Sequence, residues 1–313
     1  MKTLILTEGG RGIGFGHLSR CLALSQALKQ AGAQVKFIIY GDATAAEFLK
    51  ANKQGASSFN WQKGDQNFIN EAAGFDLAII DSYLAKKTLY DKFSKLFQGR
   101  LAMIDDFNRL QYPQGVVISP SIYGHRLAHP EKNGSTYLLG RDYVILRREF
   151  RKAARKAINK KIRNILVTFG GIGNYKLAKT IIELLRRKFH CNFQIVEPNK
   201  NRFNAKRMLK VMSKADICVS AGGQTTYELA RLGVPTIGIC FAENQKFNLE
   251  FGQELRFIEY VGWHNDSRLQ DKIMAAAERL NSRETRLKMS LAGSSYIDGK
   301  GAQRIVKHLL HGR

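Results

Sequence analysis

Residues 3–17, TLILTEGGRGIGFGH, carry an apolar run that passes directly into a glycine-rich turn. The same order returns at residues 164–171, NILVTFGG. A short apolar run that ends in glycines is typical of a buried strand followed by a tight turn, the opening of a parallel β-α-β unit. Its two occurrences predict that the chain repeats this architecture.

Further apolar runs alternate with segments of helical periodicity in both halves of the chain. Additional strands are predicted at residues 34–41, 77–83, 101–107, 115–121, 192–198, 217–223 and 235–241. Helices are predicted at residues 17–32 and 175–189. We therefore expect two doubly wound, Rossmann-like α/β domains, residues 1–150 and 151–313, that face a cleft lined by the carboxyl ends of their strands.

The chain is strongly basic. Its 313 residues have a formal net charge of +24, and the densest basic stretch, RREFRKAARKAINKKIR, occupies residues 147–163. The stretch lacks the interleaved aromatic residues of nucleic-acid modules, so no nucleic-acid partner is expected. It is consistent with a solvated helix at the domain boundary or with peripheral contact to an anionic membrane.

Several features favour a cytoplasmic protein. No apolar run reaches the roughly 18 residues that a membrane helix needs. The first apolar run enters the glycines without a small-residue cleavage site, which favours a strand over a signal peptide. The four cysteines have no metal-ligand spacing and are interpreted as reduced thiols. The oligomeric state is not determined by these features.

The first glycine turn ends at His17, where a helix begins. Glycines allow a ligand to approach the backbone closely, and a helix N-terminus offers N–H groups to an anion. Histidine, with an ordinary pKa of about 6.5, suits a general base at neutral pH. We predict that His17 is catalytic and that Gly14, Gly16 and Arg20 contact the substrate, although His17 as a capping or packing residue is the alternative.

A nicotinamide enzyme is a second interpretation of this turn. A dinucleotide site requires the spacing G-x-G-x-x-G and an acidic residue some 20 positions further on. Here Gly12, Gly14 and Gly16 alternate, and His17 occupies the sixth position of that template. Asp42, at the end of the next strand, would have to serve as the acidic residue.

The run IGFGHLSRCLALSQAL, residues 13–28, resembles the first motif of the nucleotide-sugar hydrolases of the pseudaminic acid pathway and of their spore-coat polysaccharide relatives. More distantly it is similar to the glycine loop of the undecaprenyl-diphosphomuramoylpentapeptide N-acetylglucosaminyltransferase. The resemblance extends to the segment 220–245 and to DGKGAQRIV, residues 298–306. It implies the glycosyltransferase-B fold and a catalytic role for His17.

Acidic and aromatic residues follow two of the predicted strands. Asp81 and Tyr83 follow one, and Asp105 and Asp106 follow another. Residues at the carboxyl ends of parallel strands face the ligand, so Asp81 is expected to orient His17 or hold a sugar hydroxyl, and Tyr83 to contact the sugar. Alternatively, the carboxylates cap helices or turns. The sequence has no Asp-x-Asp triplet, and neither a metal nor a cofactor is expected.

The second half is predicted to bind the nucleotide. Two glycine turns precede helices and are expected to face the diphosphate; their residues are Gly170, Gly171, Ser220, Ala221, Gly222 and Gly223. Glu228 either closes a capping box with Thr225 or, by the resemblance, holds the ribose hydroxyls of uridine. Asn244 and Gln245 carry amides that suit the diphosphate or the sugar.

The resemblance implies hydrolysis of a UDP-2,4-diacetamido-2,4,6-trideoxy sugar to UDP and the free sugar, with inversion. The family's first loop is rich in aspartate and serine, whereas this chain has Thr7-Glu8-Gly9-Gly10-Arg11, which leaves the sugar open. An inverting glycosyltransferase with the same UDP-sugar donor and an alcohol acceptor is the main alternative. A non-catalytic UDP-sugar-binding protein is a third interpretation.

Overall fold

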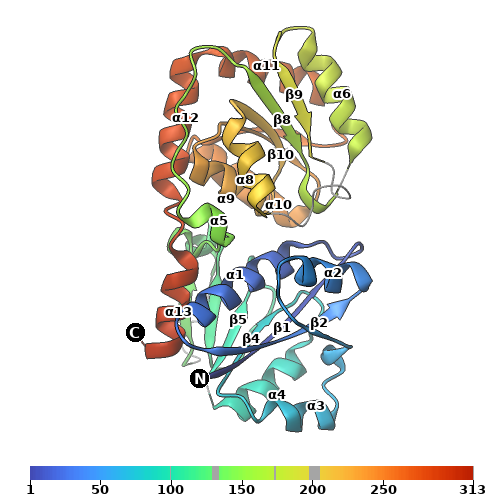
Figure 1. Ribbon diagram of the computed structural model, residues 1–313, viewed down its shortest axis with the longest axis vertical. Coiled ribbons are helices and arrows are strands. Elements are labelled where there is room, and N and C mark those ends of the chain that lie inside the picture. The colour runs from blue at the N-terminus through green and yellow to red at the C-terminus, as the bar shows by residue number, and fades with distance from the viewer. Residues whose placement is uncertain (99, 129–133, 173, 197–204, 313) are drawn as a thin grey trace. The chain divides into compact units, whose positions relative to one another are not determined.

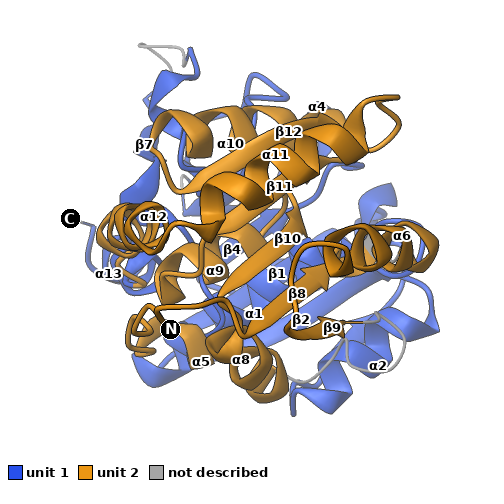
Figure 2. Cartoon of the chain, turned by 90° about the horizontal axis from the view of Figure 1, so that it is seen from above, with its two compact units in different colours: residues 1–148, 300–313 blue, residues 149–299 orange. Residues whose placement is uncertain are grey.

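A computed structural model describes residues 1–98, 100–128, 134–172, 174–196 and 205–312 (Figure 1). The contacts between residues divide the chain into two compact units (Figure 2). Unit 1 comprises residues 1–148 and 300–313, and unit 2 comprises residues 149–299. Residues 300–313 therefore group with the first unit, whereas the division predicted from the sequence placed them in the second domain.

Unit 1 is built on a parallel sheet that, in the described residues, has seven strands in the order β3-β2-β1-β4-β5-β6-β7. The strands are β1 (Lys2–Gly9), β2 (Gln34–Gly41), β3 (Ser57–Ser58), β4 (Leu77–Asp81), β5 (Leu101–Ile104), β6 (Val116–Ser119) and β7 (Thr136–Leu139). Its α-helices are α1 (Gly16–Gln30), α2 (Ala43–Ala51), α3 (Gln66–Ala72), α4 (Lys87–Phe97) and α13 (Gly301–His311). Short 3-10 turns lie at Trp61–Lys63, Gly124–Arg126 and Arg141–Tyr143.

Alternation along β1 explains why helices cover both faces of this sheet (Figure 1). Leu4 and Leu6 pack in a buried cluster with Phe93 of α4. Side chains alternate along a strand, so Ile5, which is fully buried, points to the other face. Strands buried on both faces are typical of doubly wound folds.

Unit 2 repeats the plan with a parallel sheet of five strands among its described residues, in the order β12-β11-β10-β8-β9. They are β8 (Asn164–Thr168), β9 (Asn192–Ile195), β10 (Ile217–Ala221), β11 (Thr236–Cys240) and β12 (Ile258–Trp263). The helices are α5 (Arg148–Arg151, at the boundary), α6 (Tyr175–Arg186), α8 (Ala205–Lys214), α9 (Thr225–Leu232), α10 (Glu243–Glu254), α11 (Leu269–Asn281) and α12 (Arg283–Tyr296), with a 3-10 turn at Gly170–Ile172.

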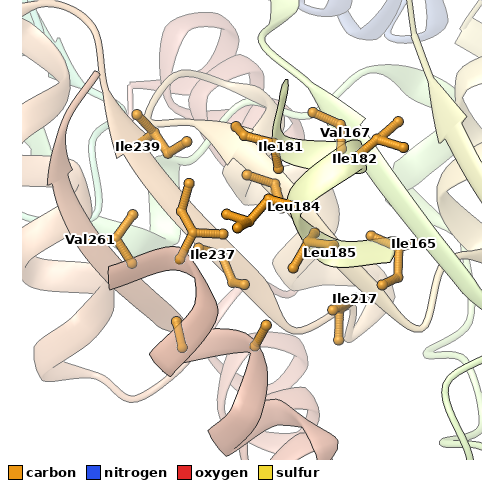
Figure 3. Close-up of a cluster of buried hydrophobic side chains, with 14 of the residues drawn as sticks. Ile165, Val167, Ile181, Ile182, Leu184, Leu185, Ile217, Ile237, Ile239 and Val261 are labelled. Atoms are coloured by element: carbon orange, nitrogen blue, oxygen red, sulfur yellow. The ribbon is translucent and has the colours of Figure 1, made fainter. Parts of the chain in front are cut away.

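The core on one face of this sheet is mostly aliphatic (Figure 3). Ile165, Val167, Ile217, Ile237 and Ile239 project from the strands onto side chains of α6 and α11. The prediction of two doubly wound α/β domains is confirmed by these two sheets. In the part of the chain that the structure describes, no helix is long and apolar enough to cross a membrane.

The basic stretch at residues 147–163 is not the solvated helix that its composition favoured. Only Arg148–Arg151 are helical, and the chain then runs without helix to β8. Arg151 is buried, and the ammonium of Lys156 lies 2.9 Å from the carboxylate of Asp216. Some of these cations therefore make internal contacts that hold the segment against the rest of unit 2.

The contact between β1 and β2 gives a test of close packing. A Cβ added at Gly41 would lie 1.9 Å from the carbonyl oxygen of Gly9, its partner in register, whereas one added at Gly12 would meet nothing within 4 Å. We expect Gly41→Ala to lower the free energy of unfolding by about 1–3 kcal/mol or more. Gly12→Ala should leave it unchanged or raise it by up to about 1 kcal/mol. Urea denaturation checks both, and equal effects would contradict the packing.

Candidate functional site

The first glycine turn is a small hairpin. Gly10 and Gly14 exchange backbone hydrogen bonds of 3.0 and 2.7 Å. Both have positive φ angles, +132° and +92°, which side chains rarely tolerate. Residues 11–13 form the tip, and the backbone N–H of Arg11 donates to the carboxylate of Asp42 at 2.9 Å.

Asp42 is thereby committed to the hairpin and to α2. It accepts from the backbone N–H of Thr44 as the N-cap residue of that helix. Hydrogen bonds from the Thr44 hydroxyl and from the Arg11 backbone lower the pKa of Asp42 below its ordinary value. The acidic residue that a nicotinamide site would need therefore holds the loop instead of a ribose, and that interpretation loses its basis.

His17 lies in the first turn of α1 and is 6% exposed. Its Nδ1 is 2.7 Å from Oδ1 of Asp81, the last residue of β4. A Cβ added at Gly14 or Gly16 would meet nothing within 4 Å, so the backbone directly before the histidine has open space beside it. The structure thus brings together His17 and Asp81, as the sequence predicted for an oriented base.

The short contact fixes the tautomer of the neutral ring. A carboxylate oxygen only accepts hydrogen bonds, so Nδ1 must carry the proton that it donates to Asp81. The other nitrogen, Nε2, then holds a lone pair, and in the described part of the chain it has no hydrogen-bond partner. Proton abstraction at Nε2 would create an imidazolium whose charge Asp81 stabilises.

Arg20, one helical turn after His17, joins two carboxylates. Its Nε and Nη2 each donate to Asp81 at 2.6 Å, and its Nη1 contacts both oxygens of Asp106 at 2.8 and 2.6 Å. Burial would lower the pKa of Arg20, but Asp106 and Asp81 raise it well above the ordinary value. The structure gives Arg20 the role of a buried counter-ion, and its contact with the substrate stays a prediction.

Asp81 stays ionised despite complete burial. Burial acts to raise its pKa, but the charge of Arg20 and the contact with His17 outweigh this effect and hold the pKa well below the ordinary value. A permanently charged acceptor is what keeps the proton of His17 on Nδ1.

Tyr83 packs its ring edge against His17, with 4.3 Å between ring centroids and an angle of 85°. Its hydroxyl donates to Asp106. Burial, and next the charge of Asp106, raise the pKa of Tyr83 far above its ordinary range, so the hydroxyl keeps its proton. Tyr83 therefore shapes the wall beside His17 and is unsuited to be the base.

Glu8 has a role that the sequence did not assign to it. Glu8 is fully buried and accepts from the backbone N–H of Tyr83 at 2.7 Å, from the Ser82 hydroxyl and from Gln62 at 2.6 Å. The strand register explains these contacts. Thr7 of β1 pairs with Asp81 of β4, so the residues that follow them, Glu8 and Ser82, also lie side by side. Glu8 thus holds the turn that positions Tyr83.

The neighbouring carboxylates of Asp105 and Asp106 have different partners. Asp105 accepts from the backbone N–H groups of Phe107 and Arg109, as strand-ending aspartates ordinarily do. Asp106 instead binds Arg20 and Tyr83. The sequence predicted that both face the ligand and could not separate them.

In unit 2, the strand β10 ends in Ser220 and Ala221, which are buried, and Gly222 and Gly223 turn the chain into α9. A Cβ at Gly222 would meet Leu249 at 2.6 Å, whereas one at Gly223 would meet nothing within 4 Å. Gly222 is therefore required for packing, while Gly223 leaves its backbone open to a ligand.

The glycine turn at Gly170 and Gly171 lies beside the turn at Gly222 and Gly223. Gly170 has a φ angle of +59°, and a Cβ added there would be 3.7 Å from the hydroxyl of Thr225, the first residue of α9. Gly171 is exposed. Both turns predicted to face a diphosphate therefore lie near the start of one helix.

Glu228 lies in the first turn of α9 and is 1% exposed. The helix begins at Thr225 with Gln224 at the N-cap position, and no side chain caps it. Thr225 is thus the first helical residue and not the cap residue that the predicted capping box requires. A ribose contact by Glu228 stays a prediction.

Asn244 and Gln245, which follow β11, differ in whether their side-chain amides are already hydrogen-bonded within the protein. Gln245 accepts from the backbone N–H groups of Gly222 and Phe241, both at 3.2 Å, so its oxygen holds the turns together. Asn244 is exposed in the first turn of α10. The buried Asn248, which the sequence missed, donates to the carbonyl of Gly222 at 2.6 Å.

Three rings directly follow the carboxyl ends of β8, β11 and β12. Phe241 stacks on His264 with centroids 4.8 Å apart and 10° between planes, and Phe169 lies 4.9 Å from Phe241. The sequence signal, an aromatic residue directly after a strand, was present at Phe169 and Phe241. In the described residues, no group of three or more His, Cys, Asp or Glu side chains could hold a metal ion.

These two units define the glycosyltransferase-B fold, which the solved structures confirm. MurG of Acinetobacter baumannii superposes with a TM-score of 0.67 at 14% identity, over 99% of both chains. The UDP-GlcNAc 2-epimerase of Neisseria meningitidis, solved with UDP-GlcNAc bound, superposes with a TM-score of 0.60 at 16% identity, over 99% of this chain and all of that one.

No family model matches the chain, but curated relatives confirm the resemblance seen in the sequence. It is 23% identical to the spore coat polysaccharide biosynthesis protein SpsG of Bacillus subtilis, over 97% of this chain and 96% of that protein. It is 25% identical to the pseudaminic acid cytidylyltransferase and UDP-2,4-diacetamido-2,4,6-trideoxy-beta-L-altropyranose hydrolase of Helicobacter pylori, over 74% of this chain. An uncharacterised Methanocaldococcus jannaschii protein is 24% identical over 79% of this chain. The matches span 43% and 57% of these last two relatives, about half their length.

The Arg20 bridge gives a stability prediction. Arg20→Met leaves two carboxylates without their cation, and we expect a loss of about 3–5 kcal/mol in the free energy of unfolding at neutral pH. Because the folded pKa of Asp81 is depressed, this contribution is present above the unfolded value of about 3.9 and is lost as the pH falls toward the folded value. The difference from wild type, measured by urea denaturation, should therefore shrink below about pH 4.

Lys50→Met, an exposed change on α2, serves as the control and should have an effect within about 0.5 kcal/mol. A deficit in Arg20→Met that does not change with pH would contradict the ionic origin of the effect.

Proposed function

We propose that this protein is an inverting nucleotide-sugar hydrolase that cleaves the glycosyl–diphosphate bond of a UDP-linked diacetamido-trideoxy sugar and releases UDP and the free sugar. The proposal draws on the hydrolase activity named for the Helicobacter pylori relative. The Bacillus subtilis relative is named for spore coat polysaccharide biosynthesis, which favours a place in the assembly of surface glycans.

The observation that carries the proposal is the His17–Asp81 contact of 2.7 Å. It leaves Nε2 as a basic nitrogen in a site that is nearly closed to solvent, next to glycines that leave room for a ligand. A base oriented by a buried carboxylate is the arrangement that activates a hydroxyl nucleophile.

In the proposed reaction, Nε2 of His17 removes a proton from water while the water oxygen forms a bond to the anomeric carbon. The bond from that carbon to the diphosphate oxygen breaks, and its electron pair leaves with UDP. The nucleophile enters opposite the leaving group, so the configuration inverts. The proton on His17 passes to solvent after the products leave. The diphosphate is a good leaving group and needs no strong acid.

Unit 2 is proposed to hold the nucleotide. The N–H groups at the start of α9, where no side chain caps the helix, and the open backbone of Gly223 suit the diphosphate. Asn244 and the amide nitrogen of Gln245 are proposed to contact the diphosphate or the sugar, and Glu228 the ribose.

An inverting glycosyltransferase is the second candidate, since several solved structures that share the fold, among them the spinosyn forosaminyltransferase SpnP, are named as transferases. His17 would then deprotonate an alcohol in place of water. The two functions differ in one observable property, which is the release of free sugar when no acceptor is present.

The decisive experiment follows UDP release and the anomeric configuration of the freed sugar by proton NMR, with a panel of UDP-amino sugars and no acceptor. We expect inverted free sugar from the wild type and a rate lower by about 10²–10⁴ in His17→Ala, because a general base contributes about that much. Binding without release in the wild type would rule out the hydrolase for that panel and favour a transferase. Unchanged turnover in His17→Ala would exclude His17 as the base.

Tyr83→Phe provides the matched comparison. The change keeps the ring against His17 and removes only the hydroxyl that donates to Asp106. Turnover should stay within about tenfold of wild type, since one hydrogen bond to a charged group contributes about 1.5 kcal/mol. A loss as large as that of His17→Ala would instead give the hydroxyl a direct part in the chemistry.

A further inference from the structure

Basic residues gather at one edge of the sheet of unit 2. The strands β10, β8 and β9 are neighbours and parallel, so their amino ends lie side by side. Each is preceded by exposed cations, and the start of α12 joins them because Arg283 contacts the carbonyl of Ile158 at 3.4 Å. We call this set the basic rim: Lys160, Lys161, Arg163, Arg187, Lys214 and Arg283.

The rim is not neutralised by the acidic residues around it. Asp216 is buried and bound by Lys156, Glu278 pairs with Lys188, and Glu284 pairs with Lys288. In the described ranges of the chain, no carboxylate lies within salt-bridge distance of a rim residue. Six exposed charges of one sign at one edge therefore remain uncompensated.

The exposed face of α8 extends this surface. Lys206, Lys210 and Lys214 are spaced by four residues and all exposed, which places them in one row along the helix. The opposite face of α8 is buried through Met208 and Met212. The row ends at Lys214, where it meets the rim.

The proposed nucleotide site does not use this charge. Its glycine turns follow the carboxyl ends of β8 and β10, and the rim precedes their amino ends. A strand of five residues at about 3.3 Å per residue separates the two edges by about 16 Å. At physiological ionic strength the Debye length is about 8 Å, so the rim contributes little to holding a diphosphate at the other edge.

We propose that the basic rim docks the protein on an anionic lipid surface. Attraction to such a surface needs positive charge spread over several side chains and no specific pocket. Recognition of single-stranded nucleic acid would also need exposed rings for base stacking. Among the described residues of unit 2, the large exposed apolar side chains are Tyr175, Phe247 and Leu291. Tyr175 begins α6 and Phe247 lies in the second turn of α10, and these helices follow the carboxyl ends of β8 and β11, away from the rim.

The test compares two triple variants of the full chain. One reverses rim charges, Lys160→Glu, Lys161→Glu and Lys214→Glu. The other changes three exposed lysines of unit 1, Lys50→Glu, Lys86→Glu and Lys95→Glu, and lowers the net charge equally. Binding is measured by sedimentation with phosphatidylcholine vesicles that contain about 30% phosphatidylglycerol, and with vesicles of phosphatidylcholine alone.

We expect the wild type to bind only the anionic vesicles and to lose that binding between about 0.1 M and about 0.5 M salt. The rim variant should bind at least about tenfold more weakly, while the control stays within about threefold. Thermal unfolding confirms that both variants are folded. UDP-sugar turnover is measured separately, so failure of the proposed function does not affect this test.

Three results would overturn the proposal. The wild type could fail to bind the anionic vesicles, or both variants could lose binding equally, which would make the effect one of net charge alone. A single-stranded RNA homopolymer could also bind the wild type more tightly than the vesicles and lose its affinity in the rim variant, which would identify a nucleic-acid surface.

Discussion

The organisation of unit 1 depends on the buried carboxylate of Asp81. An ionised group without exposure to water is costly unless charges and hydrogen bonds compensate it. His17 and Arg20 supply both, and their spacing of three residues places them on one face of α1. The position of α1 over the end of β4 and the orientation of the imidazole are therefore set by the same interaction. The network then extends from Arg20 to Asp106, and from Asp106 to Tyr83.

The two units use glycine turns in different ways. In unit 1 the glycines form a hairpin pinned by Asp42 and leave space beside His17. In unit 2 they lead into a helix whose first N–H groups are not capped by a side chain. The first arrangement suits a reacting centre and the second an anion. This difference supports the proposal that chemistry and nucleotide binding are divided between the units.

The order of the strands also decides which basic residues lie together on the surface. Cations that the linear sequence places in one basic stretch are partly buried or paired, as with Arg151 and Lys156. Other cations that are distant in sequence, such as Lys161 and Lys214, lie at one edge of the sheet. They precede β8 and β10, which are parallel neighbours. A surface of uniform charge thus arises from strand order, which no window of sequence contains.

The sequence by itself determined the fold class and located most of the strands, because apolar runs and glycines act locally, but it missed β3, β7 and β12. It also offered a contact between His17 and Asp81 as one of the roles open to Asp81, since both follow strands of one parallel sheet. Only the tertiary structure decided which carboxylates serve the site. Glu8, Arg20 and Asp106 acquire their roles through partners 61 to 86 residues away. Such contacts depend on register and on burial, which are properties of the packed sheet and not of any local pattern.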